Sequence, residues 1–315
     1  MTTSLRAAAA VIIASLAAST AVAQRRPRRP TPPVEAPAPP PQATPVTAVT
    51  ASRAPSPAEA ATPEAPAPEA LVTHRARRTA LEVSLALRGF TRTFTWTDDL
   101  FGELRPYTLA VAPSGQGSVE WYPAAHFTDT FLGDLGLTAR AEGAFALVSR
   151  DSAGREYATS AWGLSVGARV RVPVGGVELG LLGSYGWSTY AVEASGGAND
   201  LGVPAVTYAF GRAGADLRAR PAERWALAVS ASWLFVQGTG DALPDAFPNS
   251  RAGGAEVTLA VTHALTDALE LRLQLDARRF FHTLDPRPGD RWVAGGALDH
   301  QVGFGLGVGW RLPGV

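Results

Sequence analysis

Four residues in two distant segments have the types that hydrolytic chemistry uses. Asp98 and Asp99 are adjacent, and His282 precedes Asp285 by three positions. A histidine beside carboxylates can act as a general base toward water, so a fold that joins these segments would support hydrolysis. The same residues also suit structural roles, because Asp is favoured in turns. We expect the structural roles, and so predict no catalytic residues and no enzyme activity.

Oxygen-bearing side chains gather in one further segment, where Asp241, Asp245 and Asn249 lie close together in the sequence. Carboxylate and amide oxygens are ligands of hard cations such as calcium. Acidic residues are also ordinary in solvated loops, so we predict no metal site and no cofactor. The sequence contains no cysteine, which excludes disulfides and thiolate metal sites. The alternate glycines of residues 303–309 precede no helix pattern, so they do not form a phosphate-binding loop.

The elements that would position these residues are strands. Residues 269–278 show the pattern most clearly, because apolar and polar side chains alternate throughout this segment. A period of two predicts a strand with one apolar and one polar face. A helix would bring Leu269, Arg272 and Leu273 to one side and mix a charge into its apolar stripe.

The same alternation recurs often enough to predict an all-β chain of ten strands. Phe90 and Phe94 change parity with respect to residues 81–87, which indicates a bulge or the end of the membrane-spanning part of the strand. From residue 135 onward, short turns alternate with longer loops, as in antiparallel up-and-down barrels. Eight or twelve strands remain open, because the region around Pro113 and the stretch after Asp290 can be divided differently. The predicted strands lie near residues 81–88, 104–122, 135–147, 162–172, 177–187, 205–219, 225–235, 255–262, 269–281 and 302–312.

Charged residues of these segments share one parity, opposite to the apolar residues. An arginine turned toward lipid at the middle of a bilayer costs about 2–4 kcal/mol, so the charged face is predicted to line a lumen. Basic and acidic residues are nearly balanced there, which predicts a salt-bridged and largely filled lumen. The predicted lumen residues are Glu82, Arg88, Arg140, Glu142, Arg169, Arg171, Glu178, Arg212, Asp216, Arg218, Glu256, Glu270, Arg272, Asp276 and Arg278.

Aromatic residues on the apolar parity favour a membrane barrel over a secreted β-sandwich. Trp225 and Phe235 share a face and are ten positions apart, which on a tilted strand spans close to the roughly 25 Å apolar band of such barrels. Most predicted strands also exceed the usual globular strand of about 5–6 residues. The predicted aromatic girdle consists of Trp187, Trp225, Trp233, Phe235 and Trp310.

With this alternation, turn asymmetry and aromatic-bearing last strand, residues 79–315 resemble the superfamily of small outer-membrane β-barrels with eight to twelve strands. The resemblance rests on no family-specific motif. It implies the outer membrane of a Gram-negative envelope as the location, with outer-membrane lipid and the outer-membrane assembly machinery as partners. The balanced lumen then predicts a structural barrel or a narrow transport conduit.

Two other functions remain open. A protease-like or lipase-like hydrolase would use Asp98, Asp99, His282 and Asp285 at the rim of the barrel. A surface adhesin would bind its partners through the loops at residues 193–204 and 238–251.

The residues before the barrel predict export. Arg6, an apolar core at residues 7–18 and a small-residue cleavage site before Gln24 predict a signal peptide over residues 1–23. Residues 24–78 are rich in Pro and Ala, which predicts a disordered periplasmic linker. The four arginines among residues 25–29 could contact cell-wall polymer, or could simply be solvated. A formal net charge of zero predicts no nucleic-acid partner.

Overall fold

The computed structural model describes residues 78–150, 155–192 and 205–315. The chain divides into two units, Met1–Ala70 and Leu71–Val315, and every described residue belongs to the second. The predicted signal peptide, the predicted linker up to residue 77 and the loop at residues 193–204 lie outside the described residues. None of the helices in the described ranges has the length and apolar content needed to cross a bilayer.

Eleven strands form in the described residues, and most are far longer than strands of globular proteins. Their alternating side chains suit a sheet with one apolar face, and their lengths suit tilted membrane crossings. The strands are β1 (Thr79–Thr97), β2 (Tyr107–Trp121), β3 (Leu135–Ala144), β4 (Val148–Arg150), β5 (Glu156–Val174), β6 (Val177–Val192), β7 (Val206–Ala222), β8 (Trp225–Gly238), β9 (Arg251–Ala264), β10 (Leu269–Thr283) and β11 (Gly296–Pro313).

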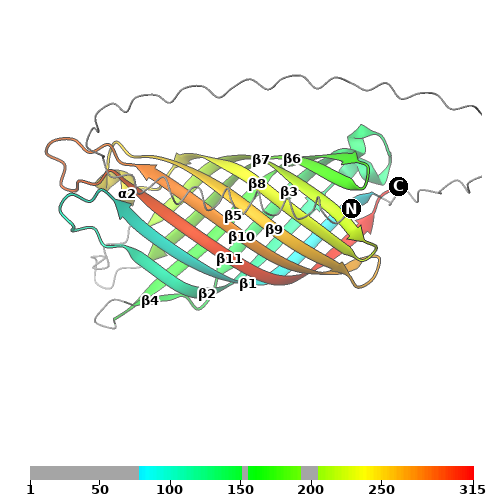
Figure 1. Ribbon diagram of the computed structural model, residues 1–315, viewed down its shortest axis with the longest axis horizontal. Coiled ribbons are helices and arrows are strands. Elements are labelled where there is room, and N and C mark those ends of the chain that lie inside the picture. The colour runs from blue at the N-terminus through cyan, green and yellow to red at the C-terminus, as the bar shows by residue number, and fades with distance from the viewer. Residues whose placement is uncertain (1–77, 151–154, 193–204) are drawn as a thin grey trace, which may run out of the picture. The chain divides into compact units, whose positions relative to one another are not determined.

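Ten of these strands close into an antiparallel barrel (Figure 1). Sequence neighbours pair around the ring, and β1 meets β11 from Leu81↔Leu312 to Thr97↔Gly296. The ring closes where β3 pairs with β5, while the three-residue strand β4 pairs with β5 alone. The prediction of an up-and-down barrel with ten strands is therefore confirmed, and β4 is an addition to it.

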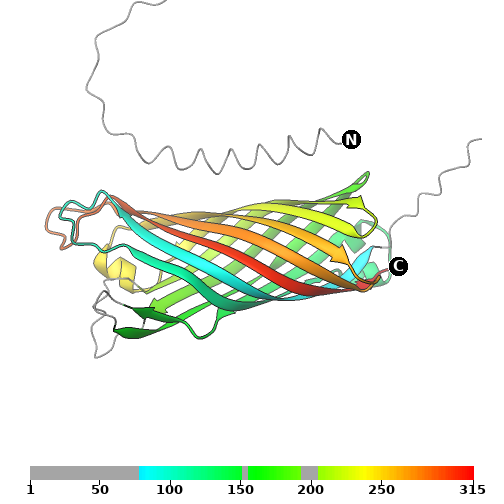
Figure 2. The same ribbon diagram turned by 60° about the horizontal axis from the view of Figure 1, so that its bottom comes forward.

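The two ends of the barrel differ, as Figures 1 and 2 show. Tight connections at residues 175–176, 223–224 and 265–268 mark one end, which we call the short-turn end. Residues 122–134 join β2 to β3 at the same end through two 3₁₀ helices, η2 (Pro123–His126) and η3 (Phe131–Asp134). The opposite, loop end carries longer connections, one of which contains the helix α2 (Ala242–Ala246).

The barrel is apolar outside and charged inside. On β10, Leu273 is 50% exposed and Leu275 is 49% exposed, whereas Glu270 is 1% exposed and Asp276 is 9% exposed. This distribution of apolar and charged side chains is the reverse of that in a soluble protein. In water, a continuous belt of leucine, valine and tryptophan would be exposed to solvent. A bilayer provides the apolar solvent that this outer surface requires.

The parity change predicted at Phe90 and Phe94 is not caused by a bulge in the first strand. Strand β1 pairs with β11 without a break up to Thr97, and Phe90, Arg92 and Phe94 stay on the inward side that begins with Glu82. The irregularity lies in β2, between the partners of Phe90 and Arg92. Aromatic residues break the apparent pattern because they face inward near the loop end.

The third predicted strand ends earlier than expected. A strand that ran over residues 135–147, as predicted, would place Leu147 on the apolar parity of Leu135 and so outward. However, β3 stops at Ala144, and Leu147 is buried inside the barrel. The backbone turns at Ala146, whose φ of 53° lies in the left-handed region. The region around Pro113, by contrast, is the single irregular strand β2 that the sequence left open.

Candidate functional site

The middle of the lumen is organised around Glu256 on β9. Its carboxylate accepts hydrogen bonds from Arg278 Nε at 2.6 Å and from Arg212 Nη2 at 3.1 Å. A third guanidinium, from Arg140, lies 3.3 Å away. Three strands besides β9 therefore send an arginine to one buried carboxylate, which alone cannot neutralise them.

Two further carboxylates complete this mid-lumen cluster. Glu142 on β3 accepts from Arg88 Nη1 at 2.8 Å and from Arg278 Nη1 at 2.9 Å. Both carboxylate oxygens of Asp276 on β10 accept hydrogen bonds from Arg88 Nη2, at 2.5 and 2.7 Å. The cluster thus joins strands from both ends of the chain, and it contains four arginines and three carboxylates, one positive charge in excess.

A second charged cluster fills the lumen near the short-turn end. Arg169 on β5 binds both oxygens of Asp216, at 2.8 and 2.5 Å, and its Nη2 also donates to Glu178 at 2.8 Å. The hydroxyl of Tyr122 accepts from Arg169 Nη1 at 2.6 Å. The guanidinium of Arg171 lies 3.5 Å from the centre of the Tyr122 ring, so the connection after β2 folds into the end of the barrel.

The same cluster extends to the strands that join the two ends of the chain. Glu82 on β1 pairs with Arg272 and, at 3.6 Å, with Arg218. Glu270 on β10 pairs with Arg272 at 2.9 Å and with Arg311 on β11. Every residue predicted for the lumen lies inside the barrel and forms at least one ion pair.

Glycines on β11 make room for these side chains. A Cβ at Gly309 would lie 2.7 Å from the carboxylate of Glu270, and one at Gly303 would lie 2.8 Å from Asp276. Both distances are shorter than van der Waals contact, so a larger residue would displace the ion pairs. The alternating glycines of this strand thus have a packing role in the crowded lumen.

Limited free space remains between the charged side chains. A cavity of about 220 Å³ lies between the two clusters, with Gln116, Ser184 and Thr258 among its lining residues. A smaller cavity of about 40 Å³ lies above the mid-lumen cluster, against Phe90, Ser114 and Tyr190.

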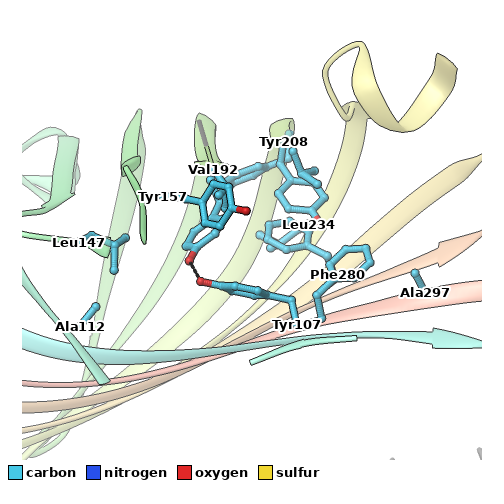
Figure 3. Packing of buried hydrophobic residues seen from close by; sticks show 13 residues of the cluster. Tyr107, Ala112, Leu147, Tyr157, Val192, Tyr208, Leu234, Phe280 and Ala297 are labelled. Carbon is cyan, nitrogen blue, oxygen red and sulfur yellow. Dashed lines mark hydrogen bonds between the residues drawn. The ribbon is translucent and has the colours of Figure 1, made fainter. Parts of the chain in front are cut away.

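Toward the loop end, the interior changes from charged to aromatic. Figure 3 shows Tyr107, Tyr208, Leu234 and Phe280 pointing toward one another from different strands. The rings of Tyr208 and Phe280 stack with their centroids 3.6 Å apart and an interplanar angle of 8°. This aromatic cluster is fully buried and crosses the lumen above the ion pairs.

One ion pair is embedded in the aromatic cluster. Arg92 on β1 binds Asp299 on β11 through Nε at 2.8 Å and Nη2 at 2.7 Å, and both side chains are 0% exposed. Tyr208 donates to Asp299 at 2.9 Å, and its hydroxyl also lies 2.9 Å from His282 Nε2. Arg92 in turn lies 3.9 Å from the ring centre of Tyr190. The pair joins the first and last strands at the loop end.

The residues considered for hydrolysis are placed in different surroundings. Asp99 accepts hydrogen bonds from the backbone nitrogens of residues 101, 102 and 104, so it holds its own loop together. His282 is buried and faces Tyr208 inside the barrel. Asp98 and Asp285 both adopt positive φ in loops, at 54° and 43°. The contacts found for His282 are therefore with the buried Tyr208 and not with the acidic loop residues.

The loop at residues 239–250 folds over the loop end. Leu243 on α2 and Phe247 are buried against Leu284, and the Phe247 ring lies 5.4 Å from that of Trp96. Asn249 Nδ2 donates to the backbone oxygen of Asp285 at 3.4 Å. Asp241 is the N-cap residue of α2, and Asp245 lies within its single turn. Within residues 78–150, 155–192 and 205–315, no three His, Asp or Glu side chains gather as a metal site.

The predicted aromatic girdle faces outward on two levels. Trp225 and Trp310 lie near the short-turn end, and Trp187, Trp233 and Phe235 lie toward the loop end, all on the exposed surface. Trp121 and Trp162, which share the apolar parity, are also exposed and extend the two levels. Amphipathic rings at these depths suit the two interfaces of a bilayer.

The sequence missed several interior residues. Arg92 was overlooked because its strand was thought to change parity, and Asp299 because the last strand was expected to begin at Val302. Glu120, which pairs with Arg218 at 2.5 Å, was not identified as an interior residue because the sequence defined its strand poorly. Continuing the even parity of β1 past Phe90 would have placed Arg92 inside the barrel.

These features define a class of protein. Ten strands close into a ring, and the barrel has an apolar belt, aromatic girdles and an ionic interior. The chain is an outer-membrane-type β-barrel.

No protein-family model matches the sequence, and no curated protein matches it. Among solved structures, the fold is similar to outer membrane protease OmpT from Escherichia coli, with 12% identity over 74% of this chain and 96% of that chain and a TM-score of 0.40. It is also similar to Neisserial surface protein A, with 11% identity over 74% of this chain and 98% of that chain and a TM-score of 0.31. Ail, the attachment invasion locus protein of Yersinia pestis, shows 12% identity over 74% of this chain and 99% of that chain, with a TM-score of 0.31. Identities this low do not extend the activity of any of these proteins to this chain.

Proposed function

We propose that this protein is an outer-membrane barrel with a largely filled lumen and no wide axial channel, serving as a structural barrel or a narrow conduit. The observation that carries the proposal is the succession of layers across the lumen. Two ionic clusters, the aromatic cluster and the folded loop that carries α2 follow one another from the short-turn end to the loop end. Ions that are all paired inside a protein leave little charge to attract a permeating solute.

The orientation supports the same proposal. In outer-membrane barrels, short turns face the periplasm and longer loops face outward, so the short-turn end is assigned to the periplasm. Both β1 and β11 reach that end, and the linker predicted over residues 24–78 would then extend into the periplasm. Cell-wall polymer is a candidate partner for its arginines, and lipid and the assembly machinery are the partners of the barrel.

Planar-bilayer recording tests the closed lumen. The purified protein, inserted into bilayers at neutral pH, is expected to give no steady open-channel conductance, because the ion pairs and the aromatic cluster block the axis. A general diffusion porin recorded under the same conditions serves as the positive control. Large and steady conductance steps would contradict the proposal and make the protein an open porin.

A further inference from the structure

The barrel wall is incomplete beside β2. Pairing between β2 and β3 ends at Ser114↔Ala144, although β2 continues to Tyr107. On the other side, β4 pairs with β5 from Val148↔Ala158 to Arg150↔Glu156 and with no other described strand. The β2 segment 107–112 and strand β4 therefore face each other without a ladder of backbone hydrogen bonds. We call this boundary the β2–β4 seam.

The chain itself creates the seam by crossing from one side to the other. Phe145 N still donates to Pro113 O on β2 at 3.2 Å, whereas Leu147 O accepts from Thr159 N on β5 at 3.2 Å. The left-handed residue Ala146 lies between these two bonds. Strand β3 thus leaves β2 within two residues, and the rest of the wall on that side belongs to β5.

Side chains, in place of backbone pairing, hold the seam closed. The hydroxyl of Tyr107 on β2 lies 2.8 Å from Ser149 Oγ on β4 and is also hydrogen-bonded to the hydroxyl of Tyr190. Thr159 on β5 donates to the same Ser149 oxygen at 2.8 Å. Figure 3 shows the Tyr107 ring lying across the interior with its hydroxyl meeting that of a second ring. One tyrosine side chain therefore links the two edges.

Both sides of the seam are apolar. On the inner side, Ala112, Leu147 and Tyr157 belong to the buried aromatic cluster. On the outer side, Val111 is 60% exposed and Phe145 is 50% exposed. Trp162, the last β5 residue paired with β3 before the seam, belongs to the outward girdle at the level of a membrane interface. The seam begins at this level, on the loop-end side of Trp162, and thus separates an apolar interior from the interfacial region of one lipid leaflet.

From this geometry we propose that the β2–β4 seam is a lipid-facing portal for a small, uncharged, apolar molecule, with Tyr107 as its latch. The cavity of about 40 Å³ lies inside the wall next to the seam, beside the last β2–β3 pair. Ser114, Ala144 and Ala161 line it, and the ion pairs of the mid-lumen cluster form its floor. Tyr190, whose hydroxyl is hydrogen-bonded to that of Tyr107, lines this cavity, so release of the Tyr107 latch frees one of the residues in its wall. The ion pairs of Arg88 below exclude a path for apolar molecules along the axis, so the molecule enters and leaves through the seam.

The absence of cysteine from the sequence allows a direct test by thiol labelling. Ala112→Cys places a thiol behind the seam, and Ala297→Cys places one in the same cluster on β11, away from the seam; both alanines are 1% exposed. Each variant is refolded into lipid vesicles and treated with N-phenylmaleimide, an uncharged aromatic reagent, or with a sulfonated maleimide. The cysteine at position 112 is expected to react with N-phenylmaleimide about tenfold faster than the one at 297.

Loss of the latch should increase this difference. Adding Tyr107→Phe removes the hydrogen bonds but keeps the ring, and is expected to accelerate labelling at 112 by about five- to tenfold while leaving 297 unchanged. Tyr107→Ala should accelerate it further. Equal rates at the two positions, or no response to either Tyr107 variant, would overturn the portal. Faster labelling at 112 by the sulfonated reagent would also overturn it, because the seam would then open to water. The axial conductance measurement is independent of all these outcomes.

Discussion

Replacing Glu256 with glutamine is expected to destabilise the barrel by about 3–5 kcal/mol, because removal of one partner leaves buried ions uncompensated. Three arginines, Arg140, Arg212 and Arg278, converge on this carboxylate. Glutamine keeps the size and one acceptor oxygen but loses the charge, so the mid-lumen cluster would hold four arginines and two carboxylates. Urea unfolding of the protein in lipid vesicles measures the change in the free energy of unfolding.

The matched control for Glu256 is Glu223→Gln. Glu223 lies in the turn between β7 and β8 and is exposed, so its replacement is expected to change the free energy of unfolding by less than about 0.5 kcal/mol. If both variants unfolded at the wild-type urea concentration, the mid-lumen cluster would not contribute to stability as its geometry indicates.

The Asp299→Asn substitution is expected to lower the free energy of unfolding by a similar amount, about 3–5 kcal/mol. Asp299 pairs with Arg92, and both side chains are fully buried at the loop end. Asparagine cannot neutralise the guanidinium, and the hydroxyl of Tyr208 loses a charged acceptor. The same urea titration measures this loss, with Asp267→Asn in an exposed turn as the control.

A double variant separates the effect of losing the ion pair from the cost of leaving one buried charge unpaired. Arg92→Met with Asp299→Leu removes both ions and fills the space with apolar atoms, which is often neutral or stabilising for buried ion pairs. The double variant is therefore expected to be more stable than Asp299→Asn alone. If it were less stable, the cost of Asp299→Asn would come from packing and not from the unpaired arginine.

Alternation in the sequence was sufficient to predict the barrel and many of its ionic side chains, although Arg92, Glu120 and Asp299 were missed. The leucines from Leu269 to Leu275, and Glu270 and Arg272 between them, lie as expected, because a period of two in a closed sheet has only two possible faces and lipid excludes charge from one. The number of strands followed from the turns. The lumen residues were thus identifiable one strand at a time.

Partner choice across the lumen could not be predicted in the same way. Arg88 binds Asp276 from 188 positions away, and Arg92 binds Asp299 from 207 positions away. These pairs depend on tilt and register around the whole ring, which no local pattern records. The seam depends on a single left-handed residue, Ala146, in a segment where the alternation appeared to continue. Interior aromatic residues such as Phe94 were hidden for the related reason that apolar side chains occur on both faces near the loop end.

The claim on which the whole account depends is that the chain closes into a barrel that requires an apolar solvent. Gel mobility of detergent-refolded protein, with and without boiling, tests it most directly when combined with circular dichroism. The account predicts a β-rich protein that migrates faster before boiling and shifts on heating. A protein that folds in water without detergent and shows one mobility under both conditions would contradict the membrane barrel and indicate a secreted β-sandwich.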